Sequence, residues 1–166
     1  MIEQTSNRGG GSIWSEAEIE DVSTTARKHG LAVHMDGARI LNAVVASGVT
    51  AKAMCRHVDT VWLDLSKGLG CPIGGVLAGP KAFINEAWRW KHRLGGAMRQ
   101  SGIVAAAGVY ALENNIDLLR ADHDNAKLLA RRIAEIPGFK LYTPEIATNI
   151  VFFDVTGAGL TAKGVC

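Results

Sequence analysis

The sequence predicts an α/β protein in which a mostly parallel sheet is covered on both faces by helices and is followed by the start of a smaller α+β unit. Two observations carry this prediction. Segments with helical periodicity alternate with short apolar runs. The helical signal then stops at Pro137-Gly138, and two further apolar runs follow. We therefore expect a large domain over residues 1–137 and the beginning of a small C-terminal domain over 138–166.

The first helix has the most complete end signals. Ser15 and Glu18 have the spacing of a capping box, and Lys28 precedes Gly30 at the other end. Apolar runs short enough to be strands occupy 31–36, 60–65 and 74–79, and a helical pattern occupies 38–47. Further helices are expected over 81–93, 101–114 and 117–136, strands over 139–143 and 149–155, and the start of a helix over 160–166.

Composition excludes several classes of protein. The chain of 166 residues is 48% hydrophobic and 20% charged, which is typical of a globular domain. A net charge of +2 is too small to indicate a nucleic-acid or membrane-surface partner, although Arg89, Lys91 and Arg93 alternate with Trp88 and Trp90. The three cysteines are widely spaced, which argues against a disulfide framework. No secretory signal and no apolar run long enough to span a bilayer is visible. We expect a cytoplasmic protein.

A lysine in a glycine-rich turn is the first candidate functional residue. Lys67 stands in "DLSKGLG", two residues beyond the apolar run that ends at Leu65. A solvated loop lysine between turn glycines is the ordinary interpretation. In the functional interpretation, an apolar strand end favours the neutral, nucleophilic amine, and Gly68 and Gly70 let the backbone approach a ligand closely.

Asp36 ends the preceding strand, 31 residues before Lys67. Ligands bind at the carboxyl ends of strands in open α/β sheets. The two side chains are compatible with a plain buried ion pair, or with pyridoxal phosphate, which needs a lysine for a Schiff base and a carboxylate for its pyridine nitrogen. His34 shares a strand face with Asp36, so it either orients that carboxylate or is a satisfied core histidine.

Three motifs in register resemble the low-specificity L-threonine aldolases. They are "HMDGAR" at 34–39, "SKGLGCPIGG" at 66–75 and "GGAMRQ" at 95–100. This family belongs to the fold-type I pyridoxal-phosphate enzymes, together with the aromatic amino acid β-eliminating lyases. The resemblance implies that residues 1–137 are the C-terminal part of the cofactor-binding large domain.

The resemblance also implies roles for five residues. Lys67 would hold pyridoxal 5'-phosphate as a Schiff base, and Asp36 would pair with the pyridine nitrogen. Arg39 would lie near the phenolic oxygen of the cofactor and the substrate carboxylate, and Ser66 would lie near the phosphate. Arg99 would reach a phosphate across a subunit boundary, which implies a homo-oligomer, a dimer or a tetramer. No metal is implied.

The implied reaction is retro-aldol cleavage of a β-hydroxy-α-amino acid, L-threonine or L-allo-threonine, to glycine and acetaldehyde. A related β-eliminating amino-acid lyase is the first alternative, because Asp36 and Lys67 serve the cofactor rather than the substrate. The second is an inactive piece that only associates with other subunits. It arises because family members are considerably longer, so we expect this chain to be an internal fragment.

Overall fold

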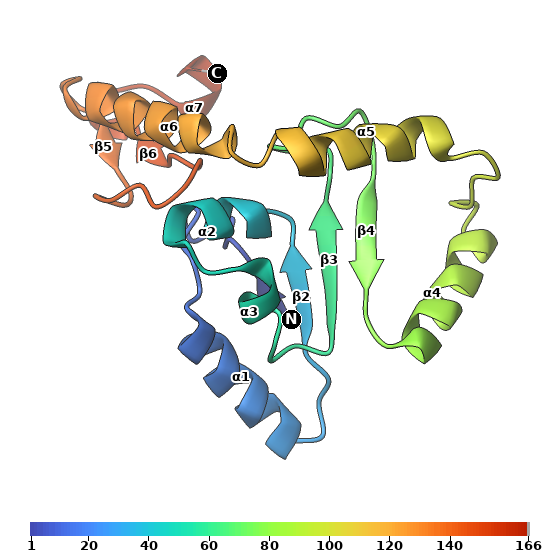
Figure 1. The fold of residues 1–166 in the computed structure, drawn as a ribbon. Helices are drawn as coiled ribbons and strands as arrows, with labels where there is room; N and C mark the ends of the chain where they lie inside the picture. The colour runs from blue at the N-terminus through green and yellow to red at the C-terminus, as the bar shows by residue number, and fades with distance from the viewer. Residues whose placement is uncertain (166) are drawn as a thin grey trace.

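The computed structural model describes residues 1–165 and places helices on both sides of a central sheet (Figure 1). Cys166, with the end of the helix expected over 160–166, lies outside the described residues. The elements, in chain order, are β1 (Ile2–Glu3), α1 (Glu16–Lys28), β2 (His34–Gly37), α2 (Ile40–Ser47), α3 (Ala51–Met54), β3 (Thr60–Asp64), β4 (Gly75–Ala78), α4 (Lys81–Arg93), α5 (Gly102–Asn114), α6 (Leu119–Ala134), β5 (Lys140–Leu141), β6 (Phe153–Asp154), the short 3-10 helix η1 (Thr156–Ala158) and α7 (Ala162–Val165).

The central sheet has the strand order β1-β2-β3-β4. The first three strands are parallel, and β4 runs antiparallel to β3. The predicted mostly parallel α/β arrangement is therefore confirmed. Strand β1 is only two residues long and was not predicted.

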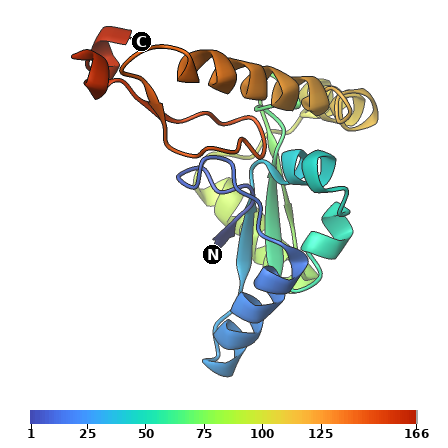
Figure 2. The same cartoon turned by 90° about the vertical axis from the view of Figure 1, so that its left-hand side faces the viewer.

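One face of the sheet carries the main core. Met35 of β2 is fully buried there together with Ile19, Ile40 and Met54, which come from α1, α2 and α3. On α2, Ile40 and Ala43 stand three residues apart and both are buried, as expected for one face of an amphipathic helix. In Figure 2 the same helices lie on one side of the sheet and α4 lies on the other.

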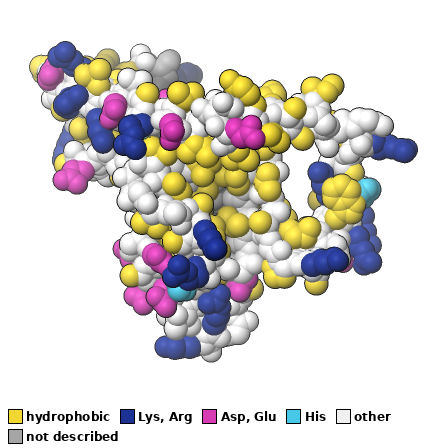
Figure 3. All heavy atoms as spheres, viewed as in Figure 1, with side chains coloured by type: hydrophobic (Ala, Val, Ile, Leu, Met, Phe, Trp, Pro, Cys, Tyr) yellow, Lys and Arg dark blue, Asp and Glu magenta, His cyan; other side chains and the backbone are white. Residues whose placement is uncertain are grey.

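The expected cover on both faces is incomplete. All four residues of β4 are exposed, and α4 buries none of its residues. Between them lies a groove of about 410 Å³, lined partly by Trp62, Leu77 and Trp88. Lys and Arg side chains surround α4 on the surface (Figure 3). On this side of the sheet the described residues supply one helix, α4, and it does not bury β4.

Helix α5 runs above the carboxyl end of β3, and α6 continues past α2 towards β5 and β6 (Figure 1). Ala111 of α5 packs on Leu65 and Leu69, which flank Lys67. Farther on, α6 buries Ala126 and Ala130 beneath the antiparallel pair β5–β6. No helix within residues 1–165 is long and apolar enough to cross a membrane.

Candidate functional site

The carboxyl ends of β2 and β3 lie side by side because the two strands are parallel. Asp36 is in register with Trp62, and Leu63 of β3 is in register with Gly37. Alternation along each strand places Asp36, Trp62 and Asp64 on the sheet face opposite the main core. Lys67 follows β3 by three residues, so its turn begins at this edge.

Lys67 lies in a tight turn in which its carbonyl accepts a hydrogen bond of 2.9 Å from the Gly70 amide. Gly70 has φ +73°, a conformation that glycine adopts without strain. The Lys67 ammonium is 3.0 Å from Asp64 Oδ2 and 5.4 Å from the centroid of the Trp62 ring. Its side chain is 40% exposed. The apolar environment expected for this amine is not what the structure shows, because the Asp64 carboxylate lies in contact with it.

The partner of Lys67 is Asp64, which the sequence analysis did not single out. Asp64 is only 7% exposed, and its Oδ1 accepts hydrogen bonds from the Ser66 amide at 2.9 Å and the Ser66 hydroxyl at 2.7 Å. Burial alone would raise the pKa of Asp64, but the hydrogen bonds from Ser66 and the Lys67 ammonium outweigh it and lower that pKa. The detectable signal was an acid three residues before the lysine.

Asp36 is half-buried and makes one side-chain hydrogen bond, from the Ala38 amide to Oδ1 at 3.0 Å. Within residues 1–165 its Oδ2 has no hydrogen-bond partner and forms no ion pair with Lys67. The alternative of an Asp36–Lys67 ion pair is thus not realised. His34 Nδ1 lies 2.8 Å from the Thr60 hydroxyl, so His34 is satisfied by β3 and does not orient Asp36.

The two predicted arginines lie in different places. Arg39 is half-buried at the start of α2, and it lines a small cavity together with Asp64 and Gly68. Arg99 is exposed in the segment between α4 and α5. Asp36, Arg39, Ser66 and Lys67 lie at or just beyond the carboxyl ends of β2 and β3. The segment that contains Arg99 lies at the end of the molecule away from β2 (Figure 1).

Hydrogen bonds and packing contacts fix the Lys67 turn against α5 and α6. The Asn115 side-chain amide donates to the Leu69 carbonyl at 2.8 Å, and the Cys71 thiol contacts the Ala107 carbonyl at 3.5 Å. A Cβ at Gly68 would stand 2.6 Å from Leu119 Cδ2. Gly68 therefore permits close packing of the turn against α6, whereas the predicted reason for this glycine was the close approach of a ligand.

A buried hydrogen bond joins α6 to α2 next to this turn. Asn42 Nδ2 is 3.1 Å from His123 Nε2, and both side chains are 3% exposed. Burial lowers the pKa of His123, and the neighbouring Lys127 lowers it further. An amide nitrogen can only donate, so the ring nitrogen accepts, which requires neutral imidazole. Sequence periodicity had not indicated either residue.

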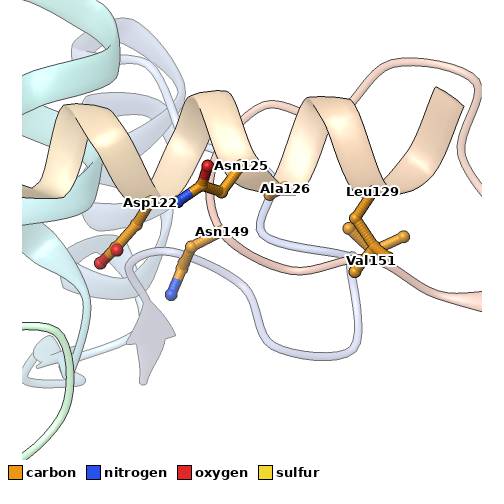
Figure 4. Close-up of a pocket in the computed structure, with 6 residues that line it drawn as sticks. All are labelled: Asp122, Asn125, Ala126, Leu129, Asn149 and Val151. Atoms are coloured by element: carbon orange, nitrogen blue, oxygen red, sulfur yellow. The ribbon is translucent and has the colours of Figure 1, made fainter. Parts of the chain in front are cut away.

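A larger cavity lies elsewhere. It measures about 510 Å³ between α6 and the segment before β6, and Figure 4 shows Asp122, Asn125 and Asn149 on its walls. None of the five predicted site residues lines it. Within residues 1–165, no group of three His, Cys, Asp or Glu side chains is placed to hold a metal ion.

Comparison with known proteins identifies the family of this chain. The family model described as beta-eliminating lyase matches residues 1–156. The chain belongs to this family. A low specificity L-threonine aldolase of Escherichia coli K12 is 45% identical to it over 163 residues, which are 98% of this chain and 47% of that protein. A low-specificity L-threonine aldolase 1 of Arabidopsis thaliana is 39% identical over 98% of this chain and 46% of that protein.

Solved structures of the beta-eliminating lyase family agree in fold. A protein of Exiguobacterium sp. 255-15, assigned as an aromatic amino acid beta-eliminating lyase/threonine aldolase, superposes with a TM-score of 0.81 at 28% identity. That match covers 91% of this chain and 43% of the other. The chain thus spans a little under half the length of the relatives it matches.

Proposed function

We propose that this chain carries part of the active site of a pyridoxal-phosphate-dependent lyase that cleaves L-threonine or L-allo-threonine to glycine and acetaldehyde. One observation carries the proposal. Asp36 and Lys67 stand at adjacent ends of two parallel strands, in a chain that is 45% identical to a low specificity L-threonine aldolase. Because the chain spans 47% of that relative, the activity belongs to a longer protein or to an assembly.

The side chains present fit this cofactor. The free Oδ2 of Asp36 is an acceptor for a protonated ring nitrogen, and Lys67 is a primary amine open to solvent. Arg39 forms no ion pair within residues 1–165, so its guanidinium is available to an anionic group. Pyridoxal phosphate, joined to Lys67, would supply an electron sink for the bond broken at the α-carbon of the substrate.

Each predicted site residue would then have its own role. Lys67 holds and releases the cofactor, and Asp36 keeps a proton on its ring nitrogen. Arg39 lies near the phenolic oxygen of the cofactor and the substrate carboxylate, and Ser66 lies near the phosphate. Arg99, exposed and distant from the other four, reaches the phosphate of a neighbouring subunit, which makes the active protein a homo-oligomer.

Two properties beyond the site belong to the same proposal. Residues 1–137 form the large-domain part and 138–166 the start of the small domain, with α6 packed on α2 at one end and beneath β5 at the other. A cytoplasmic location fits the thiols of Cys55 and Cys71, which are both free.

A β-eliminating lyase is the second candidate, favoured by the description of the matching family. Asp36 and Lys67 would act identically in both enzymes, so the products separate them. An aldolase yields glycine and acetaldehyde, whereas elimination yields a keto acid and ammonia. An inactive chain that only associates with other subunits would yield neither.

The test is covalent labelling of Lys67. Purified protein is mixed with pyridoxal phosphate, its absorbance is recorded before and after borohydride reduction, and the modified peptide is mapped by mass spectrometry. We expect an adduct on Lys67 that is lost in Lys67→Ala and kept in the matched variant Lys91→Ala, since Lys91 is an exposed helical lysine. An adduct spread over surface lysines, or none, would contradict the proposal.

A further inference from the structure

The cavity between α6 and the segment before β6 is lined by none of the predicted site residues. We propose that it binds a small molecule in which a primary ammonium is joined to a short branched aliphatic chain, as in an aliphatic amine or an aliphatic α-amino acid. The ammonium lies at Asp122, and the chain lies against Leu129 and Val151. This site is separate from the one in the proposed function and does not depend on it.

A stripe of α6 and an extended segment form the walls of this cavity. The stripe has the spacing i, i+3, i+4 and i+7, which places its members along one side of the helix: Asp122, Asn125, Ala126 and Leu129. Asn149 and Val151, two residues apart in sequence, form the opposite wall (Figure 4). Since a helix rises about 1.5 Å per residue, the wall on α6 is about 10 Å long. The volume of about 510 Å³ is ordinary for a small-molecule site.

The walls change from polar to apolar along this length. Asp122, Asn125 and Asn149 lie at one end of the cavity, and Leu129 and Val151 lie at the other (Figure 4). Leu129 is 52% exposed, so the apolar end keeps surface that a ligand can cover. Covering that surface is favourable because it removes apolar groups from water. The cavity therefore favours a ligand with one polar and one apolar end.

Asp122 decides the charge of the ligand. Among the described residues it is the one charged residue on the walls, and its carboxylate forms no ion pair within residues 1–165. A carboxylate accepts charge-assisted hydrogen bonds from an ammonium, and these bonds are stronger than those between neutral groups. The same carboxylate repels an anion, so the polar end selects a cation.

Asn149 offers a second acceptor at the polar end. Its Oδ1 is shielded from solvent and has no hydrogen-bond partner within residues 1–165. A buried acceptor without a partner destabilises the protein. The terminal amide of asparagine turns easily about χ2, so a donor in the cavity can draw Oδ1 towards itself and satisfy it. A primary ammonium has three N–H donors, which are enough for Asp122 and Asn149 together.

Aliphatic amines and aliphatic amino acids share this ammonium and this chain. An amino acid adds a carboxylate, for which the amide groups of Asn125 and Asn149 are the donors on the walls. The polar end also adjoins the Lys67 turn, since Asp122 Oδ2 lies 4.0 Å from where a Cβ at Gly68 would stand. The experiment therefore includes both sources of the ammonium.

An NMR titration of isotope-labelled protein, without cofactor, tests the site. The side-chain amide signal of Asn149, identified by its loss in Asn149→Ser, reports binding at the polar end. The probes are isoamylamine, L-leucine, isocaproate, which has the chain without the ammonium, and methylamine, which has the ammonium without the chain. We expect isoamylamine to shift the signal at concentrations at least about threefold below those of isocaproate and methylamine. Tighter binding of L-leucine than of isoamylamine would assign the site to amino acids, and the reverse order would assign it to amines.

Variants at the two ends separate the two contributions. Asp122→Asn should weaken isoamylamine binding at least about threefold, because it removes the charge that faces the ammonium. Asp124→Asn is the matched control, since Asp124 is exposed on the same helix and does not line the cavity. Leu129→Ala should weaken isoamylamine binding and leave that of methylamine unchanged. Its control is Leu128→Ala, at a leucine that is 46% exposed and off the cavity wall.

The inference is overturned if isocaproate or methylamine shifts the Asn149 signal as readily as isoamylamine does, or if no probe shifts it at tens of millimolar. Equal weakening by Asp122→Asn and Asp124→Asn would also overturn it, because net charge would then govern binding. If Asp122→Asn does not fold, as judged by circular dichroism, the comparison of the probes on the wild type decides. The proposed function fails in a different way, through absence of a borohydride-stable pyridoxal adduct on Lys67.

Discussion

At the scale of single residues, His123 makes the stability of the protein depend on pH. The ring accepts a hydrogen bond from Asn42 inside the α2–α6 contact, and burial lowers its pKa below the usual value of 6.5. Near that value the unfolded chain binds more protons at this position than the folded chain. The free energy of unfolding contributed by His123 is therefore complete above pH 6.5 and is lost as the pH falls through the lowered pKa.

His123→Gln tests this dependence. Glutamine cannot titrate, so we expect the loss of stability between pH 7 and about pH 5 to be smaller than in the wild type. At neutral pH the variant should be destabilised by about 1 kcal/mol, because the hydrogen bond to Asn42 is altered. Urea unfolding followed by tryptophan fluorescence at the two pH values measures both effects.

His29→Gln is the matched control, because His29 is exposed at the end of α1. It should keep the pH dependence of the wild type. An identical pH dependence in His123→Gln and the wild type would show that His123 is not the titrating group.

At the scale of secondary structure, α1 owes its start to its sequence. The Glu18 amide donates to the Ser15 hydroxyl at 3.3 Å, and the Ser15 amide donates to Glu18 Oε2 at 2.8 Å. These bonds are the predicted capping box. The Ser15 hydroxyl also donates to Glu18 Oε2 at 2.6 Å, and the bonds from this hydroxyl and from the Ser15 amide lower the pKa of Glu18. The helix packs on the main core through Ile19, so fraying of its first turn would expose buried apolar surface.

Ser15→Ala should destabilise the protein by about 1 kcal/mol, since it leaves an amide at the helix start without a partner. Ser101→Ala is the matched control. Ser101 also precedes a helix, α5, but its side chain makes no capping hydrogen bond. Thermal unfolding of the two variants against the wild type measures the difference. Equal losses would mean that the capping box contributes nothing.

Local signals account for which elements could be predicted. Long amphipathic helices such as α1, α4 and α6 carry several turns of periodicity, and their expected limits differ from those observed by at most two residues. Strands depend on partners, so the strands expected over 139–143 and 149–155 shrink to the two-residue pairs of β5 and β6. No local pattern in the sequence predicts β1 or the antiparallel direction of β4, because both depend on the partner strand.

At the scale of the whole molecule, the site residues also divide into those that local sequence patterns predict and those that depend on contacts between segments. Asp36 and Lys67 could be singled out because strand ends are visible in the sequence and parallel strands bring those ends together. For Asp64 only the spacing of three residues from Lys67 is visible in the sequence, and their contact depends on the turn that Gly70 closes. Arg99 stays a prediction, since its proposed phosphate belongs to another subunit.

The central sheet ends at β4, which has no neighbouring strand on its outer side within residues 1–165. Strand β4 ends the strand order, so within residues 1–165 its outer backbone groups pair with no other strand. Its four residues are exposed, with Val76 at 46% and Leu77 at 37%. An apolar edge of this kind pairs readily with the edge of another copy. We therefore expect the chain to associate increasingly with concentration, through β4.

Leu77→Lys tests this expectation, because a charge on an edge strand opposes pairing while the half-exposed position tolerates it at a cost of less than about 1 kcal/mol. Light scattering against concentration should show the onset of association raised several-fold. Leu128→Lys adds the same charge at a leucine that is 46% exposed on α6, away from any strand edge, and should leave the onset unchanged. If both variants raise the onset equally, net charge governs association. If neither does, the copies meet on another surface and β4 is not the edge that joins them.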